Sequence, residues 1–186
     1  TGHTYSFGNG EGDVWLIKTD SNGNEDWNQT FGGSGQDWGK LVQETTDGGY
    51  VIVGNTKSPN KEWYDIILVK TNSNGNEEWS KIFGTTEYDV GFSVDQTSDG
   101  GFFITGGTNS FGNGEMDFWL IKTDSNGNEE WNQTFGGSYS DWGSSGLQSN
   151  DGGYIVTGWT SSFGSGDYDV WLIKTDSQGN TVPFGE

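Results

Sequence analysis

The sequence predicts an all-β protein built from small antiparallel sheets, and three observations support this prediction. The chain of 186 residues repeats itself every 52 residues, a period typical of solenoids, propellers and other repeat arrays. It contains 33 glycines at regular spacing, which indicates many tight turns and therefore many short strands. No segment has apolar residues spaced three and four apart, so we expect essentially no helix.

Three short motifs mark the repeat. The turn Asp-Gly-Gly-aromatic begins at Asp47, Asp99 and Asp151. A segment that opens with aspartate and closes with Lys-Thr begins at Asp13, Asp65, Asp117 and Asp169. The turn Asn-Gly-Asn begins at Asn22, Asn74 and Asn126, and it becomes Gln-Gly-Asn at Gln178. Because the repeat explains most of the sequence, only residues that depart from it argue for a special function.

Residues 37–88 show the first elements of one repeat. A first strand is predicted over residues 37–46, and the Asp47-Gly48-Gly49 hairpin turn follows it because glycine adopts positive φ without strain. The second strand, residues 50–56, is apolar on both faces. Such a strand needs cover on both sides of its sheet.

The second half of the repeat follows a longer polar loop. The third strand, residues 65–71, is again apolar on both faces. The turn at residues 72–76 then leads to a fourth, more polar strand over residues 78–83. Four strands in one repeat form an antiparallel sheet that can stack between two similar sheets.

A β-propeller-like array of four-stranded antiparallel blades satisfies these requirements, because each blade is stacked between two others. A β-solenoid is the alternative, but its strands pair between coils, which agrees poorly with the hairpin turns. The chain holds about 3.6 repeats in a single repeat domain of residues 1–186. We assign blades to 37–88, 89–140 and 141–186, and a blade without its first strand to 1–36.

Two segments resemble known propeller repeats. The segment Leu16–Trp27 resembles the tryptophan-docking motif of pyrroloquinoline-quinone-type propellers, and its tryptophan recurs at Trp79 and Trp131. The combination Asp-Gly-Gly-Tyr-Ile-Val-x-Gly-x-Thr with Lys-Thr-Asp-x-x-Gly-Asn resembles the seven-bladed-propeller-type repeats of secreted bacterial and archaeal proteins. The resemblance covers nearly the whole chain and implies a propeller fold and an extracellular or cell-surface location.

The last repeat departs from the pattern, since Pro183 stands where the other repeats have tryptophan. Proline cannot donate a hydrogen bond to a β-ladder, so we interpret residues 181–184 as a terminating strand or tail. We expect the missing strand of the first blade to come from this tail or from a neighbouring copy. The candidate self-association residues are Thr4, Tyr5, Val182, Pro183 and Phe184.

The composition excludes several classes of partner and site. The formal net charge of −19 repels nucleic acid and anionic membranes. No segment approaches 18 consecutive apolar residues, so we expect no membrane insertion. The chain has no cysteine, which excludes disulfides and thiolate metal sites.

The sequence offers no convincing catalytic residue. The single histidine, His3, lies at the start of the chain, which makes a Ser-His-Asp triad or a histidine zinc site implausible. Nearly all of the 27 acidic residues recur with the repeat, whereas a single active site would require a unique acid. We therefore expect a protein that is not an enzyme.

Metal binding is the stronger chemical hypothesis, with Ca²⁺ as the candidate ion and no certain cofactor. Hard cations take oxygen ligands, and oxygen-bearing side chains alternate at the Asn-Gly turns. The candidate ligands are Asp20, Asn22, Asn24 and Asp26, and their equivalents Asp124, Asn126, Asn128 and Glu130. The alternative, which we favour, is a type I′ hairpin turn capped by the preceding aspartate.

Three further sets of charged residues recur with the repeat. A carboxylate ring of Asp37, Asp89 and Asp141 would hold a cation, although hydrogen bonds from neighbouring turns explain these residues more simply. The same interpretation applies to the aspartates that open the third strands. We expect the lysine series to reach carboxylates between the blades. Its members are Lys18, Lys70, Lys122 and Lys174.

Carbohydrate binding is a further hypothesis, because sugars stack on aromatic rings and bind to Asp and Asn. The loops between second and third strands carry aromatic residues. We expect the repeated members, Phe7, Phe111 and Phe163, to fill space between blades. Trp63 does not recur, so Trp63 and the adjacent Tyr64 are the candidate ligand-binding residues.

The sequence thus favours a non-enzymatic, extracellular structural or adhesive repeat protein. Its expected partners are other copies of itself, which it would bind through incomplete terminal blades. The alternative is a lectin-like propeller that binds glycans through one weak site per blade and gains avidity from repetition.

Overall fold

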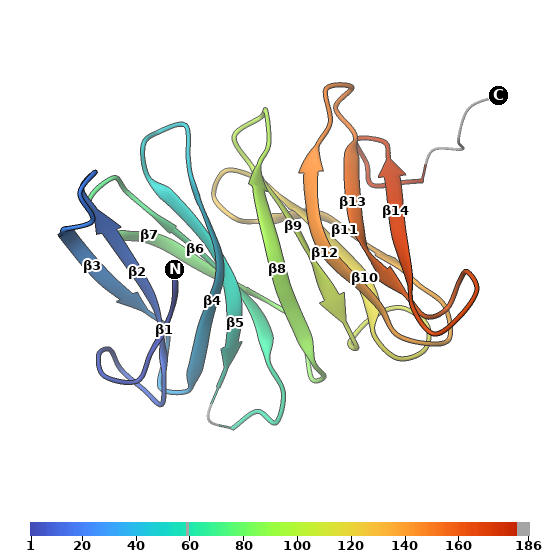
Figure 1. Cartoon of the computed structure of the whole chain (residues 1–186), viewed down its shortest axis with the longest axis horizontal. Coiled ribbons are helices and arrows are strands. Elements are labelled where there is room, and N and C mark those ends of the chain that lie inside the picture. The colour runs from blue at the N-terminus through green and yellow to red at the C-terminus, as the bar shows by residue number, and fades with distance from the viewer. Residues whose placement is uncertain (59, 182–186) are drawn as a thin grey trace. The chain divides into compact units, whose positions relative to one another are not determined.

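The computed structural model describes residues 1–58 and 60–181, and Figure 1 labels their strands. Every regular element in these residues is a β-strand, so the prediction of an all-β chain without helix is confirmed. No described segment forms a helix able to span a membrane. The strands form antiparallel sheets of three or four, arranged in repeated units. Closure into a propeller remains a prediction.

Four sheets follow one another along the chain, and each contains consecutive strands. The first holds β1 (Gly2–Thr4), β2 (Asp13–Thr19) and β3 (Glu25–Phe31). The second holds β4 (Gln36–Glu44), β5 (Tyr50–Lys57), β6 (Asp65–Thr71) and β7 (Glu77–Phe83). The third holds β8 (Asp89–Gln96), β9 (Phe102–Thr108), β10 (Asp117–Thr123) and β11 (Glu129–Phe135). The fourth holds β12 (Asp141–Gln148), β13 (Tyr154–Thr160) and β14 (Asp169–Thr175).

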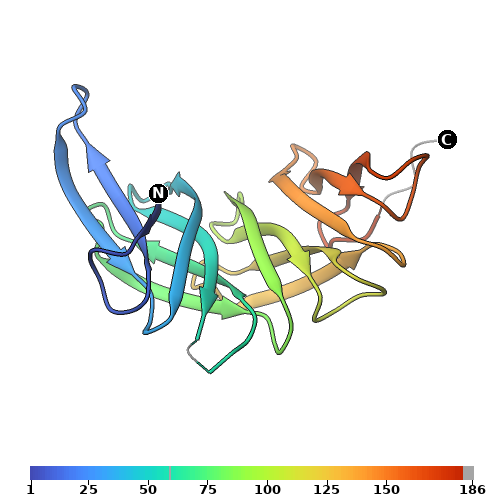
Figure 2. The same cartoon turned by 60° about the horizontal axis from the view of Figure 1, so that its bottom comes forward.

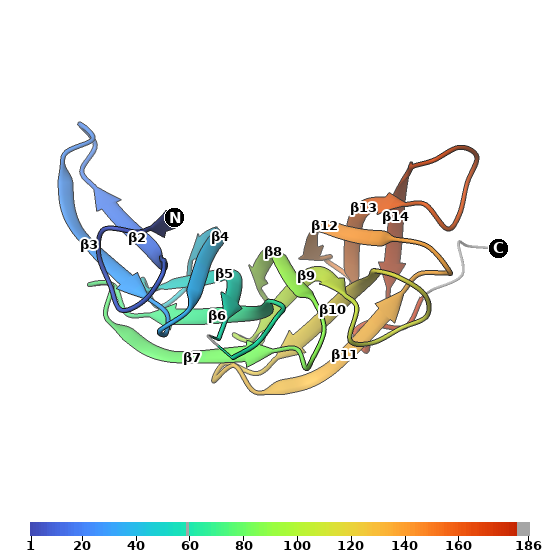
Figure 3. The ribbon, with the colours of Figure 1, turned by 90° about the horizontal axis from the view of Figure 1, so that it is seen from below.

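The chain divides into two compact units, residues 1–91 and residues 92–186. In the first unit the sheet of β1–β3 packs against the sheet of β4–β7, as Figure 3 shows. Val14 and Leu16 of β2 form a buried cluster with Ile67 and Val69 of β6. Alternate residues of a strand point to opposite faces, so one face of β2 covers the opposite face of β6.

The second unit repeats this arrangement. Phe118 and Leu120 of β10 form a buried cluster with Val156 of β13 and Ile173 of β14. Figure 2 shows the sheet of β12–β14, in orange and red, at the C-terminal end of this unit. The central strands β6 and β10 are buried along their whole length, which agrees with their apolar residues on both faces.

The tryptophan that resembles a docking motif packs on a glycine of the next repeat. A Cβ atom on Gly75 would lie 2.6 Å from the Trp27 ring, and one on Gly179 would lie 2.7 Å from the Trp131 ring. Trp27 also meets Tyr50 edge to face, with ring centroids 5.8 Å apart. The tryptophan of the preceding repeat therefore packs against the glycine of this turn.

The prediction that these turns are of type I′ is wrong. In the first turn the Gly23 N–H donates to the Asp20 carbonyl at 3.1 Å, and the Asp20 N–H donates to the Asn24 carbonyl at 2.9 Å. Gly23 has φ of 83°, and no non-glycine residue described has positive φ. The turn is therefore a type I turn that closes on a left-handed glycine, with a bulge in the adjacent ladder. The aspartate or asparagine at the first position of the turn stabilises the type I form through its side-chain hydrogen bonds. In this form the asparagine before the glycine keeps a negative φ.

The docking of Trp27 predicts unequal effects of the same substitution at two turns. Gly23 and Gly75 have similar positive φ, 83° and 78°, but a Cβ on Gly23 would meet nothing within 4 Å. Gly23→Ala should cost about 1 kcal/mol of unfolding free energy from backbone strain alone. Gly75→Ala should cost about 1–3 kcal/mol more, because the new methyl group overlaps the Trp27 ring.

Urea unfolding of the two variants beside the wild type measures both costs. Equal losses at Gly23 and Gly75 would contradict the docking contact.

Candidate functional sites

The aspartates proposed as calcium ligands at the Asn-Gly turns accept hydrogen bonds from residues of the same turn. Asp20 Oδ1 accepts the N–H groups of Asn22 and Asn24 at 2.8 and 2.9 Å, and Asp20 Oδ2 accepts the Asn24 side-chain amide at 3.0 Å. The hydrogen bonds from Asn24 and then Asn22 hold the pKa of Asp20 below its usual value. Asp124 makes the same bonds with Asn126 and Asn128.

The fourth member of each candidate set lies apart from this network. Asp26 is exposed on β3, and Glu130 accepts a hydrogen bond from Lys122 at 2.8 Å. No group of three or more acidic or histidine residues suited to a metal ion occurs in the described part of the chain. The turn interpretation accounts for these residues, and calcium binding stays an untested prediction.

Three of the four lysines in the series reach carboxylates of their own sheet, so the expectation that they bridge neighbouring blades is wrong for these three. Lys70 binds Asp47 at 2.9 Å and Glu78 at 3.0 Å, all within one repeat. Lys122 repeats this arrangement with Asp99 and Glu130, and Lys174 binds Asp151. Each lysine joins the Asp-Gly-Gly turn to the strand beside it.

The carboxylates of these turns are stabilised in their charged form. Burial alone would raise the pKa of Asp99, but hydrogen bonds from Thr97, the Gly101 N–H and Lys122 lower it to about 2. The second glycine of the motif is required by close approach, since a Cβ on Gly101 would lie 2.7 Å from Lys122 Nζ and 2.1 Å from the Thr123 carbonyl oxygen. The Asp-Gly-Gly motif therefore has a structural role.

Pairs of buried aspartates occur where one repeat meets the next. Asp65 opens β6, Asp89 opens β8, and both are buried. A Cβ on Gly84 would lie 2.4 Å from Asp65 Oδ1 and 2.7 Å from Asp89 Oδ2. Both carboxyl groups therefore face the same glycine at close range, and only a residue without a side chain fits between them.

The same pairing recurs at two other junctions. Asp13 is paired with Asp37, and Asp117 is paired with Asp141, with all four side chains buried. As the hydrogen-bond interpretation predicts, the strand-opening aspartates accept backbone N–H groups of the loop before them, for example the Gly33 N–H at 2.8 Å from Asp37 Oδ2. These aspartates anchor the loops that connect the repeats.

Burial makes these carboxyl groups costly to ionise. Burial is the main cause that raises the pKa of Asp37, and the negative charge of Asp13 adds to it. Burial likewise raises the pKa of Asp65 and of Asp117, with a smaller contribution from the second aspartate of each pair. The Oδ1 atoms of Asp37 and Asp65 accept no hydrogen bond from the described residues.

In the repeat of residues 37–88, a lysine lies beside the buried aspartate that opens the third strand. Lys61, in the loop that departs from the repeat, donates to Asp65 Oδ2 and to the Thr85 carbonyl oxygen, the latter at 2.8 Å. The equivalent positions hold Asn9 and Asn113, whose backbone N–H groups donate to Asp13 and Asp117. The atypical loop therefore replaces a backbone contact with an ion pair.

The repeated loop phenylalanines do not fill space between sheets, so that prediction is wrong. Phe7, Phe111 and Phe163 are all exposed. Each ring lies beside a tryptophan of the third strand of its own sheet, for example Phe111 beside Trp119 with centroids 5.2 Å apart. The spacing alone could not distinguish a ring enclosed between two sheets from an exposed ring beside the tryptophan of its own sheet.

The candidate ligand-binding pair differs in exposure. Trp63 is exposed and meets Tyr88 edge to face, with centroids 6.3 Å apart. Tyr64 is half-buried, and its hydroxyl donates to Gln36 Oε1 at 2.5 Å. Only Trp63 is therefore open to a ligand, and ligand binding by this pair stays a prediction.

The predicted self-association residues are placed only in part. Thr4 is buried in β1, and its hydroxyl accepts the Ser6 N–H at 3.1 Å, so it offers no contact surface. Tyr5 is exposed beside His3. The remaining predicted residues lie outside the described residues, namely Val182, Pro183 and Phe184.

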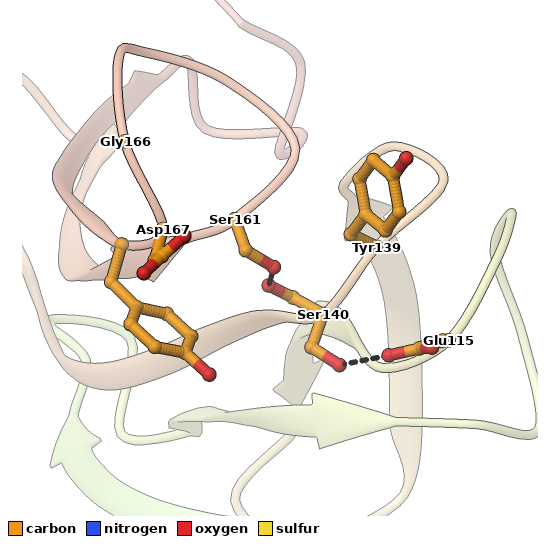
Figure 4. Close-up of a pocket in the computed structure, with 7 residues that line it drawn as sticks. Glu115, Tyr139, Ser140, Ser161, Gly166 and Asp167 are labelled. Carbon is orange, nitrogen blue, oxygen red and sulfur yellow. Dashed lines mark hydrogen bonds between the residues drawn. The ribbon is translucent and has the colours of Figure 1, made fainter.

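The second unit carries a pocket that the sequence analysis missed. Three loops line it, and Figure 4 shows Ser140 placed between Ser161 and Glu115. Ser140 Oγ donates to Glu115 Oε2 at 2.7 Å, and Ser161 Oγ donates to the Ser140 carbonyl oxygen at 2.7 Å. The lining is completed by Tyr139, Gly166, Asp167 and Tyr168. The available signal in the sequence was Tyr139, whose equivalents are Gly35 and Glu87.

Comparisons with known proteins assign the chain to no family. No protein-family model matches the chain, and no curated protein matches it. Among solved structures, the chain is similar to the crystal structure of a protein of unknown function from Bacteroides caccae. The two share 12% sequence identity with a TM-score of 0.37, over 89% of this chain and 72% of that chain.

The buried aspartate pairs predict that removal of one charge stabilises the fold. The raised pKa of Asp37 means that its protonated form is favoured in the folded state, so this stabilisation is present below the ordinary pKa near 3.8 and is lost as pH rises. Asp37→Asn should raise the unfolding free energy at pH 7 by about 1 kcal/mol. Its amide still accepts the Gly33 N–H and carries no charge beside Asp13.

Urea unfolding at pH 7 and pH 4 tests this prediction, and the gain should shrink at the lower pH. Asp20→Asn is the matched control, and it should lose stability at pH 7 because its charged form accepts the turn hydrogen bonds. An Asp37→Asn variant less stable than the wild type at pH 7 would contradict the role given to the pair.

Proposed function

We propose that this chain is a non-enzymatic structural repeat protein that associates with further copies of itself through the outer faces of its first and last sheets. The observation that carries the proposal is the exposure of β14. Val170 is 85% exposed, whereas the residues one, two and three repeats earlier, Phe118, Ile66 and Val14, are each 0% exposed. Leu172 is 55% exposed, although its equivalent Leu120 is fully buried.

The first sheet has an exposed face of the complementary kind. Ile17 of β2 is 40% exposed, while its equivalents Val69 and Ile121 are 0% exposed. Trp15 lies on the same face and is half-buried. This face corresponds to the side of β6 that receives Val14 and Leu16 in the first unit.

The two exposed faces therefore match as the two sides of a repeat junction. In the first unit Val14 and Leu16 pack on Ile67 and Val69, so the equivalent Val170 and Leu172 would pack on Trp15 and Ile17 of another copy. Burial of apolar surface contributes about 25 cal/mol per Å². Because the two faces differ, the contact is head-to-tail and either closes into a ring or extends into an array.

The finer features of the proposal follow from the sequence. A propeller-like array agrees with the 52-residue repeat and with the stacked sheets of each unit. The resemblance to repeats of secreted proteins supports an extracellular or cell-surface location. The recurrence of most acids with the repeat supports a structural role, since the buried aspartates and lysines anchor turns.

Sedimentation velocity tests the proposal. The wild type should form species larger than a monomer as its concentration rises. Val170→Asp with Leu172→Asp should weaken association at least tenfold, because two charges enter an apolar interface. The variant should keep the wild-type melting temperature, because both side chains are exposed in the single chain.

Ser125→Asp with Ser177→Asp is the control, because it adds the same charge at exposed turn positions. It should associate as the wild type does. A wild type that stays monomeric at high concentration, or a β14 variant that associates normally, would contradict the proposal.

A further inference from the structure

The pocket of the second unit lies among three loops, and two of these carry tyrosines at positions that vary between repeats. Tyr139 follows β11, and its equivalents are Gly35 and Glu87. Tyr168 precedes β14, and one, two and three repeats earlier the position holds Met116, Tyr64 and Gly12. A repeated structural role would not explain why tyrosines occur at both positions together in this unit alone, so this pocket is a candidate for a specific function.

Two tyrosine rings form the apolar part of this pocket, and both are exposed. Tyr168 meets Trp159 edge to face with centroids 4.9 Å apart, and Trp159 stacks on Trp142 at 5.8 Å. This chain of aromatic contacts orients the Tyr168 ring before any ligand arrives. A ring oriented in advance costs less conformational entropy on binding.

The polar part of the pocket is rich in hydrogen-bond acceptors. Glu115 and Asp167 are exposed carboxylates in the lining, and Glu115 is oriented by the Ser140 hydroxyl at 2.7 Å. Figure 4 shows Asp167 and Glu115 on different sides of the two serines. No lysine or arginine lines the pocket, so it suits a ligand that donates hydrogen bonds and carries no negative charge.

The equivalent pocket of the first unit is chemically different. It is lined by Lys57 and Lys61 together with Glu11, and it has Gly35 at the position of Tyr139. The tyrosine equivalent to Tyr168 is Tyr64, whose hydroxyl is engaged by Gln36. The repeat therefore provides the same location twice, and only the second unit combines two exposed rings with two carboxylates.

We propose that this pocket binds a neutral saccharide, with a sugar ring against Tyr139 or Tyr168 and separate hydroxyl groups of the saccharide donating to Glu115 and to Asp167. A sugar presents an apolar C–H face and a rim of hydroxyl donors, which match the rings and the carboxylates of the pocket. The site is single, in contrast to one weak site on every blade. It adjoins the face proposed for association, because Tyr168 also lines a hollow with Val170.

A glycan array of neutral and acidic oligosaccharides tests the assignment, followed by titration of the best neutral glycan with tryptophan fluorescence as the readout. Trp159 lies against Tyr168, so binding should change its emission. Tyr139→Ala with Tyr168→Ala should weaken binding at least tenfold. Tyr5→Ala with Phe7→Ala, which removes two exposed rings from the first unit, should leave binding unchanged.

Three results would overturn the proposal. The first is a wild type that binds no glycan on the array. The second is equal loss of binding in the two double variants. The third is binding of tetramethylammonium chloride in preference to neutral glycans, which would assign the pocket to ammonium ligands. The Ile17→Asp chain, which changes the association face of the first unit, should bind the same glycan as the wild type, which separates this test from that of association.

Discussion

The structure depends on one constraint, which is that the middle strands of each sheet are apolar on both faces. A sheet of this kind is stable only when a neighbour covers each side. The cluster of Val14 and Leu16 with Ile67 and Val69, and its counterpart in the second unit, meet this requirement. Val170 is exposed, so this face of β14 lacks the covering sheet that the constraint requires. Within each unit, the sheets formed by successive 52-residue repeats therefore cover one another.

Smaller contacts fix the geometry of each junction and leave few residues free for chemistry. Trp27 rests on the glycine turn of the following repeat, the buried lysines hold the Asp-Gly-Gly turns, and the aspartate pairs anchor the connecting loops. The aspartate pairs cost stability when both members are charged, and Lys61 offsets that cost in one repeat. Recognition is therefore assigned to the exposed faces of the first and last sheets and to loop residues that vary between repeats.

The sequence predicted the strands well, because period-two and apolar patterns act locally. The predicted strand over residues 65–71 matches β6, and the other strands of that repeat differ by at most two residues at either end. The turn type was wrong because Asn-Gly is compatible with two hairpin geometries, and the capping aspartate selects between them. The loop phenylalanines were misplaced because spacing does not define which side of a sheet a loop ring covers. The sequence did not predict the pocket of Tyr139 and Tyr168, because its lining comes from three loops that are distant in sequence.

The most direct test of the central claim is a cross-link between the two outer faces. The chain has no cysteine, so Leu172→Cys in one copy and Ile17→Cys in another provide unique thiols. A bis-maleimide linker that spans one inter-sheet spacing, about 10 Å, should join the two variants only when they are mixed. Cross-linking of the Leu172→Cys chain to itself, or no cross-link in the mixture, would contradict head-to-tail packing. A chain that carries both cysteines and cross-links only internally would contradict the role of a second copy.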